Sequence, residues 1–206
     1  MCMEERLQGN PVSEGIAYAK SYIYIPGTLT KAPDFFPKGQ EEEKYREFRE
    51  SCEKADSELV TLYNGMCKED PDKAKIFSAH RELLQDEEIL DEIRETICEE
   101  NMNPDSAVSK VYTEFAELLA GVEDPLIAER AADLRDVRDR LLRILSGQET
   151  SKLSSFSEDV ILVAHDLLPS DTATMDRKHI KGILTEVDGV ISHSAILARS
   201  YGIPAI

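Results

Sequence analysis

The sequence contains no tryptophan, only four cysteines, and far fewer basic than acidic residues. The cysteines show neither a CxxC pair nor a histidine at zinc-finger spacing, which argues against a metal centre or a redox motif. Carboxylates outnumber basic residues 41 to 24, so the formal charge of −17 repels phosphate backbones and anionic lipid headgroups. Neither nucleic acid nor a membrane is therefore an expected partner.

Long hydrophobic runs are also missing. No stretch approaches the roughly 18 apolar residues of a membrane span, and residues 1–8 have no apolar segment of the kind found in signal peptides. We therefore expect a cytoplasmic protein. What is present is ordinary globular composition, 41% hydrophobic and 32% charged over 206 residues, which is enough for one large domain or two small ones.

The middle of the chain carries the period of amphipathic helices. Apolar residues recur at intervals of three and four between Tyr45 and Met66, which predicts one long helix with a single buried stripe. A second pattern extends from Phe77 to Ile97. The acidic run at residues 86–88 interrupts it, so we expect either two helices or one bent helix.

Two further helices have clearly marked ends. Asn103 and Pro104 predict the start of the third helix and Gly121 its end, because Asn caps helix starts, Pro fits the first turn and Gly follows the last. The fourth repeats this pattern between residues 124–125 and Gly147, and the short connections predict antiparallel neighbours in a bundle. The expected buried stripe of the third helix is Val108, Val111, Phe115, Leu118 and Leu119.

Strand patterns occupy both ends of the chain. Residues 15–25 alternate small or polar residues with Ile and Tyr, as in a strand. Residues 160–164 and 180–184 are continuous apolar runs of the kind found in buried strands. Residues 194–201 predict a short helix, and residues 203–206 begin an extended segment.

These patterns predict a helical insertion within an α/β domain. We expect the α/β domain to combine residues 1–29 and 148–206 and to be truncated at its carboxyl end. Residues 30–147 would form an inserted all-α antiparallel helical bundle.

The segment from Thr185 to Ile206 is the most informative. A glycine-containing loop carries Ser192, His193 and Ser194 to the start of the predicted helix. A helix amino terminus presents unpaired N–H groups and a partial positive charge, which would meet a phosphoryl group on an imidazole nitrogen. A neutral imidazole is a good nucleophile at pH 7, and the resulting phosphoramidate readily passes its phosphoryl group onward. This pattern indicates His193 as a candidate phosphoryl carrier.

The same segment resembles the phosphohistidine signature of phosphoenolpyruvate-utilising enzymes, GGxTSHxAIxAR followed by GIPA. The signature is shared by enzyme I of the phosphoenolpyruvate:sugar phosphotransferase system, pyruvate phosphate dikinase and phosphoenolpyruvate synthase. The residues that carry the resemblance are Gly189, Ser192, His193, Ala195, Ile196, Ala198, Arg199 and residues 202–205.

Three other segments favour enzyme I within that group. Residues 129–137 are similar to its ERAADVRDI helix, residues 160–172 resemble its VILVAxDLTPSET strand and loop, and residues 13–17 resemble its SPGIA start. The chain thus resembles the amino-terminal part of enzyme I over essentially its whole length. The fold implied is a swivelling phosphohistidine α/β domain with an inserted carrier-binding bundle.

The resemblance also implies a reaction. His193 would attack phosphoenolpyruvate, release pyruvate and pass the phosphoryl group to a histidine of the phosphocarrier protein HPr. Ser192, Ser194 and Gly189 would stabilise the phosphoryl group. Arg199, six residues along the helix, either points back toward that group or forms a surface salt bridge. Phosphoenolpyruvate and Mg2+ would be held by a separate barrel domain whose ligands are not in this chain, and the complete enzyme is compatible with a homodimer.

A docking surface for the carrier is implied on the bundle. His80 matches a family histidine near this surface, with a packed structural histidine as the alternative, and Glu82 replaces an apolar residue there. Acidic side chains would steer a basic carrier. The implied docking residues are Leu83, Leu84, Glu87, Glu88, Ile89 and Arg135.

Three positions depart from the family pattern. Asp188 replaces the first Gly of the GG pair, Ile191 replaces the Thr two places before His193, and Leu168 replaces the Thr of DLTPS. These changes remove two hydroxyl partners and add a negative charge. The alternative is a degenerate, non-catalytic carrier-binding module or an enzyme I-like domain of a different phosphotransfer chain. A dikinase fragment is disfavoured, because the helical insertion stands where a dikinase has a nucleotide-binding domain.

Overall fold

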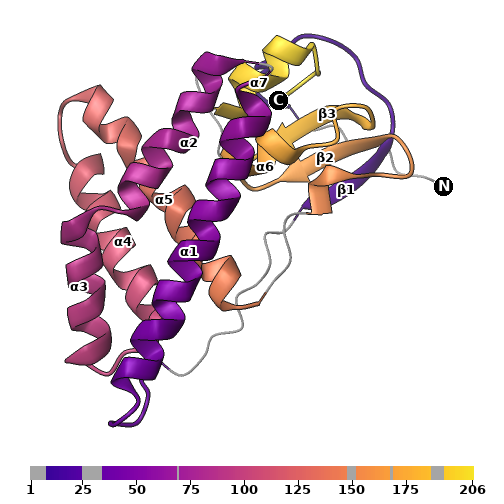
Figure 1. The fold of residues 1–206 in the computed structure, drawn as a ribbon. Coiled ribbons are helices and arrows are strands. Elements are labelled where there is room, and N and C mark those ends of the chain that lie inside the picture. The colour runs from indigo at the N-terminus through magenta and orange to yellow at the C-terminus, as the bar shows by residue number, and fades with distance from the viewer. Residues whose placement is uncertain (1–7, 25–33, 69, 148–151, 168, 187–192) are drawn as a thin grey trace. The chain divides into compact units, whose positions relative to one another are not determined.

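The structure, a computed structural model, describes residues 8–24, 34–68, 70–147, 152–167, 169–186 and 193–206. The chain forms two compact units (Figure 1). Residues 27–150 make a helical unit, and residues 1–26 with 151–206 make an α/β unit. The polypeptide therefore leaves the α/β unit, builds the helical unit and returns.

The helical unit is an assembly of long helices joined by short turns. Within the described residues these are α1 (Glu41–Met66), α2 (Pro71–Leu84), α3 (Glu87–Cys98), α4 (Pro104–Ala120) and α5 (Pro125–Leu145). α1 packs against α2 and α5, while α4 packs against α3 and α5 (Figure 1). No helix of the described ranges is long and apolar enough to cross a membrane.

The long helix α1 buries one stripe, as its sequence spacing predicts. Phe48, Ala55 and Leu59 have no exposed surface, and Cys52 is nearly covered. Full burial of a Leu or Phe side chain contributes about 1.5–3 kcal/mol, so packing holds this helix in place. Burial also raises the pKa of the Cys52 thiol to about 12, which keeps it protonated and unreactive.

The interrupted pattern after Phe77 forms two separate helices. Asp86 caps the amino terminus of α3, since its side chain accepts hydrogen bonds from the N–H groups of Glu88 and Ile89 at 3.0 and 3.2 Å. Two of the unpaired amides of a helix start are thereby satisfied. Asn103 occupies the equivalent position before α4 but makes no capping hydrogen bond through its side chain.

One predicted core residue of α4 lies on the surface. Leu118 is 70% exposed, so the prediction that it belongs to the buried stripe is wrong. Val108 and Val111 are buried as predicted, and Tyr112 and Ala116, each at most 1% exposed, complete the buried stripe. Leu118 stands two residues after Ala116, which places it about 200° further round the helix.

The α/β unit contains a parallel sheet in the order β1-β2-β3. Tyr24, Ala164 and Thr185 are the last residues of these strands and pair in one row. Beyond β3, Ala205 pairs in parallel with Ile183 and antiparallel with Ser13. The strands are β1 (Lys20–Tyr24), β2 (Val160–Ala164) and β3 (Ile180–Thr185), and they share one carboxyl edge.

The first strand is shorter than the predicted 15–25. Gly15 has φ +140°, and a Cβ on it would lie 2.6 Å from Cγ of Pro204. The chain thus passes Pro204 too closely for a side chain and does not join a ladder there. Ile16 and Tyr18, which follow, project fully into solvent.

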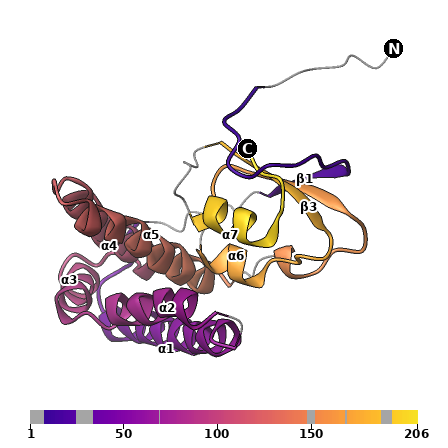
Figure 2. The ribbon, with the colours of Figure 1, turned by 90° about the horizontal axis from the view of Figure 1, so that it is seen from above.

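One face of the sheet is covered by helices. Figure 2 shows α6 (Pro169–Thr174) and α7 (His193–Tyr201) on the same side of it, and η1 (Lys152–Ser154) contacts α6. β2 turns its alternate residues toward this layer. The core there includes Leu153, Val160, Leu162, Ile180, Ile183, Ala195, Leu197 and Ala198.

Candidate phosphohistidine site and docking surface

His193 is the first residue of α7. This helix joins β3 to residues 203–206, which lie beside β3 in parallel. A helix between two parallel strands runs back against their direction, so its amino terminus lies at the carboxyl edge of the sheet. In open parallel α/β sheets this edge is where ligands bind.

The helix that begins at His193 is fixed by its buried face. Ala195 and Ala198 are at most 1% exposed, and Gly202, with φ +65°, turns the chain at its end. The N–H of Ile203 then donates to the carbonyl oxygen of Ala198 at 2.9 Å. The positive end of a helix dipole stabilises a negative group, so the backbone of residue 193 stands where a phosphoryl group would be favoured.

The predicted phosphoryl-stabilising residues have different positions. Ser194 is buried in the first turn of α7. Arg199 donates from Nη1 to the carbonyl oxygen of Val12 at 3.1 Å, which ties α7 to the amino-terminal segment. Its contact with a phosphoryl group stays a prediction. Outside the described residues lie Ser192, Gly189, Asp188, Ile191 and Leu168.

Two side-chain pairs join neighbouring elements at the carboxyl edge. The hydroxyl of Tyr24 donates to Oδ1 of Asp171 on α6 at 2.8 Å. Nδ1 of His165 lies 2.8 Å from Oε2 of Glu186. The sequence patterns did not predict this pair. The available signal was that His165 directly follows the predicted strand 160–164 and that Glu186 lies two residues after the predicted strand 180–184.

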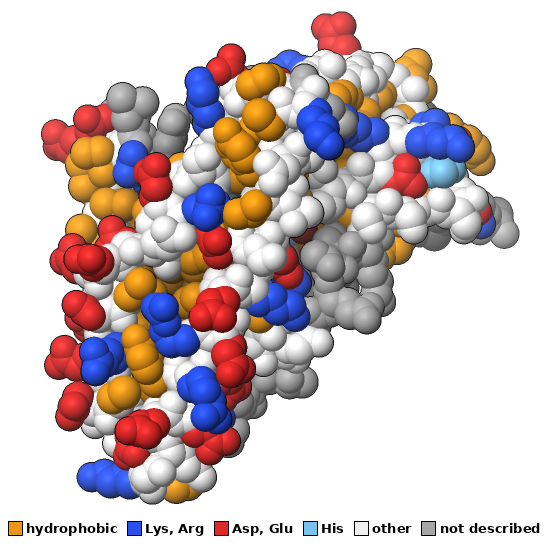
Figure 3. Space-filling model, in the orientation of Figure 1, with side chains coloured by type: hydrophobic (Ala, Val, Ile, Leu, Met, Phe, Trp, Pro, Cys, Tyr) orange, Lys and Arg blue, Asp and Glu red, His pale blue; other side chains and the backbone are white. Residues whose placement is uncertain are grey.

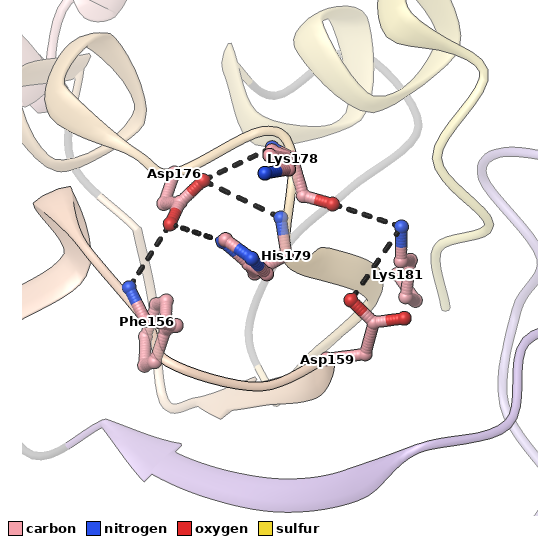
Figure 4. A network of polar contacts seen from close by, with 6 residues as sticks. All are labelled: Phe156, Asp159, Asp176, Lys178, His179 and Lys181. Atoms are coloured by element: carbon pink, nitrogen blue, oxygen red, sulfur yellow. Dashed lines mark hydrogen bonds and ion pairs between the residues drawn. The ribbon is translucent and has the colours of Figure 1, made fainter.

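A second histidine–carboxylate pair lies at the amino edge of the sheet (Figure 4). Oδ2 of Asp176 accepts from the N–H of Phe156 at 2.9 Å and lies 2.7 Å from Nδ1 of His179. The backbone donor of Phe156, followed by the His179 side chain, lowers the pKa of Asp176 to about 2. Lys181 contacts Asp159 at 3.6 Å in the same network. These contacts fix the turn that enters β3.

The predicted docking residues of the helical unit divide into surface and core. Leu84 and Ile89 are 2% and 3% exposed, so their side chains pack in the core. Leu83 is half-buried. Glu87, Glu88 and Arg135 are exposed and available to a partner.

His80 is a packed histidine that bridges α2 and α5. Its side chain has no exposed surface, and Nε2 lies 3.2 Å from Oδ1 of Asp133. Nδ1 lies 3.7 Å from Oδ2 of Asp136, which is itself 1% exposed. Phe77 contacts the imidazole edge-on. Because the ring is enclosed, it cannot contact a docked protein directly.

The turn between α4 and α5 carries an apolar patch that the periodicity did not predict. Leu118, Val122 and Ile127 are 70%, 38% and 38% exposed. Figure 3 shows hydrophobic side chains beside acidic ones at this end of the helical unit. Exposed Glu123 and Asp124 belong to the same turn. Contiguous apolar surface with a polar rim is typical of protein interaction sites.

The chain thus belongs to the α/β proteins that carry a helical insertion and begin a helix with histidine at the carboxyl edge of the sheet. Comparison with family models identifies the family. Residues 8–130 match the model described as PEP-utilising enzyme, N-terminal, and residues 156–206 match PEP-utilising enzyme, mobile domain.

Curated relatives agree with these matches. The phosphoenolpyruvate-protein phosphotransferase of Priestia megaterium is 38% identical over 99% of this chain and 35% of its own length. That of Bacillus subtilis (strain 168) is 38% identical over 98% of this chain and 35% of its own length. The chain therefore spans about a third of the curated relatives it matches.

Solved structures give the same assignment. An enzyme I solution structure (nEIt) superposes with a TM-score of 0.79 at 36% identity, covering 95% of this chain and 79% of that one. The chain belongs to the phosphoenolpyruvate-utilising enzyme family and corresponds to the amino-terminal part of enzyme I.

Proposed function

We propose that His193 accepts a phosphoryl group and donates it again. The observation that carries this is its position as first residue of α7 at the carboxyl edge, within the segment that matches the mobile-domain family. Nε2 would attack phosphorus while the bond from phosphorus to the donor atom breaks, and the reverse step would restore the neutral imidazole. Catalysis of such a transfer consists mainly of positioning and charge stabilisation.

The proposed protein partner is HPr or a similar basic phosphocarrier. Exposed Glu87 and Glu88 offer negative charge, and the patch of Leu118, Val122 and Ile127 offers apolar area to bury. Interfaces combine such an apolar centre with a charged rim, the charges chiefly accelerating association. Leu84 and Ile89 are buried, so they would contribute only indirectly, by packing beneath the exposed residues of α3.

In the complete enzyme the phosphoryl donor would be phosphoenolpyruvate, with Mg2+. We propose that their binding site belongs to the part of the relatives that this chain does not span. The described residues contain no group of three or more His, Cys, Asp or Glu side chains able to hold a metal ion. The α/β unit would swivel between the two partners, which its match to a mobile domain supports.

A donor comparison tests this function. The 206-residue chain is incubated with labelled phospho-HPr, or with labelled phosphoenolpyruvate and Mg2+. We expect reversible, acid-labile labelling from phospho-HPr alone, because proximity and charge neutralisation for phosphoenolpyruvate would be missing. Labelling that survives His193→Ala, with His179→Ala as matched control, would contradict the site.

A non-catalytic docking module is the second candidate, favoured by Asp188, Ile191 and Leu168 at positions where the family has Gly or Thr. It predicts binding of HPr without label on His193. Measuring complex formation by titration calorimetry beside the labelling assay separates the two functions.

A further inference from the structure

Two histidines of the α/β unit pair with carboxylates at opposite edges of one sheet. His179 lies before β3 at the amino edge, 2.7 Å from Asp176, and His165 follows β2 at the carboxyl edge, 2.8 Å from Glu186. Both use Nδ1. The side chains of the first pair are 24% and 14% exposed, and those of the second are 69% and 78% exposed. The two pairs therefore make the same kind of contact but differ in their position on the sheet and in the solvent exposure of their side chains.

The His165 pair lies where the chain leaves β3 toward His193. Glu186 directly follows the strand, and its N–H donates to the carbonyl oxygens of Ala164 at 3.2 Å and His165 at 3.1 Å. The carboxylate holds Nδ1, which orients the ring. Within the part of the chain that the structure describes, Nε2 of His165 has no hydrogen-bond partner.

The amino terminus of α7 lies at this same edge. β3 and residues 203–206 run parallel, so α7 must begin beside the ends of the strands. Nearby groups are mainly acidic: Asp166 follows His165, and Asp171 on α6 holds the hydroxyl of Tyr24 from β1. A phosphoryl group on residue 193 would add negative charge to an edge that already carries carboxylates.

We propose that His165 is a positioning residue for the phosphoryl group of His193, a role that rests on the proposed function. Protonated His165, oriented by Glu186, attracts the phosphoryl anion and favours the phosphorylated state. Its charge offsets the carboxylates of Asp166 and Asp171. An imidazole suits this role because it changes charge between pH 5 and 8.

The sign of the pH effect follows from linkage. The phosphoryl anion favours the protonated imidazole, so protonation of His165 must favour the phosphorylated state at equilibrium equally. The phosphoryl group is also anionic during transfer, so protonated His165 attracts it there as well and the rate changes in the same direction. Its contribution is present at low pH and disappears once the imidazole is neutral. Attraction between exposed charges is weak, so we expect an effect of about two- to five-fold.

The test uses the full chain and phosphoramidate, a small phosphoryl donor that needs no docking surface. Occupancy at His193 is followed over time by peptide mass spectrometry between pH 5.5 and 8.5, which separates it from label on any other histidine. We expect His165→Gln to react about two- to five-fold more slowly than the unaltered chain at pH 5.5 and equally fast at pH 8.5. His165→Lys should keep the faster rate at both.

The matched control is His179→Gln, which removes the pair at the amino edge and should follow the unaltered chain throughout. A constant ratio for His165→Gln across the pH range, or the same pH dependence in His179→Gln, overturns the inference. NMR gives a second readout, since the ring resonances of His165 should move when His193 is phosphorylated and those of His179 should not. Absence of label at His193 in every variant would instead contradict the proposed function.

Discussion

Replacing His80 with Ala should destabilise the helical unit by about 3–5 kcal/mol, the range for truncating a buried aromatic side chain. The imidazole is fully buried, 3.2 Å from Asp133 and 3.7 Å from Asp136. Alanine leaves a cavity and deprives both carboxylates of their imidazole neighbour. The lost contact between Nε2 and Asp133 belongs to the same truncation, so its free energy is not added to that figure.

Urea unfolding of the full chain, followed by far-UV circular dichroism, measures this loss. His165→Ala is the matched control, since that side chain is 69% exposed and its removal should change stability by no more than about 0.5 kcal/mol. His80→Leu keeps most of the volume and should fall between the two. If His80→Ala costs less than about 1 kcal/mol, the bridge between α2 and α5 contributes little and the reasoning is refuted.

Three further outcomes are expected. The pKa of Asp176 is about 2 in the folded protein, below the ordinary value of 3.8, so its ionised carboxylate stabilises the fold above pH 3.8 and this stabilisation is lost as pH falls from 3.8 to 2. The melting temperature of Asp176→Asn, measured over the same pH range, should therefore lack this decrease. Reversing Glu87 and Glu88 to Lys should slow association with HPr and flatten its salt dependence in stopped-flow measurements, and unchanged kinetics would remove these residues from the docking surface. Restoring Leu168→Thr with Ile191→Thr should raise the rate of His193 labelling by about ten-fold or more if one charge-assisted hydrogen bond forms, whereas loss of thermal stability would mean that these positions are core.

Helix locations could be predicted because they depend on short-range signals. The start of α4 at Pro104 and the end of α7 before Gly202 follow from local backbone preferences. The exposure of Leu118 could not be predicted, because hydrophobic periodicity does not distinguish two adjacent apolar stripes. Only the packing of neighbouring helices selects which stripe is buried.

Side-chain partners were the least predictable part of the candidate site. Arg199 follows His193 by six residues, yet its guanidinium donates to the carbonyl oxygen of Val12, which is distant in sequence and lies nearby because residues 12–13 and 205 pair beside the sheet. His165 and Glu186 meet for a related reason, since adjacent parallel strands end together. Pairing of this kind depends on strand order, which no local pattern specifies.

The docking surface and the His165 pair affect different steps, so their effects can be separated. Charge on α3 influences how fast a protein carrier associates, which depends on ionic strength. Charge on His165 influences the transfer itself, which depends on pH.

With phosphoramidate as donor there is no carrier to dock, so reversal of Glu87 and Glu88 should leave labelling of His193 unchanged while His165→Gln still alters its pH profile. With phospho-HPr both changes should act and their effects on rate should multiply, because neither removes a contact on which the other depends. If reversal of Glu87 and Glu88 slowed labelling by phosphoramidate as well, the helical unit would be influencing the chemistry directly, and the assignment of association to that unit alone would be wrong.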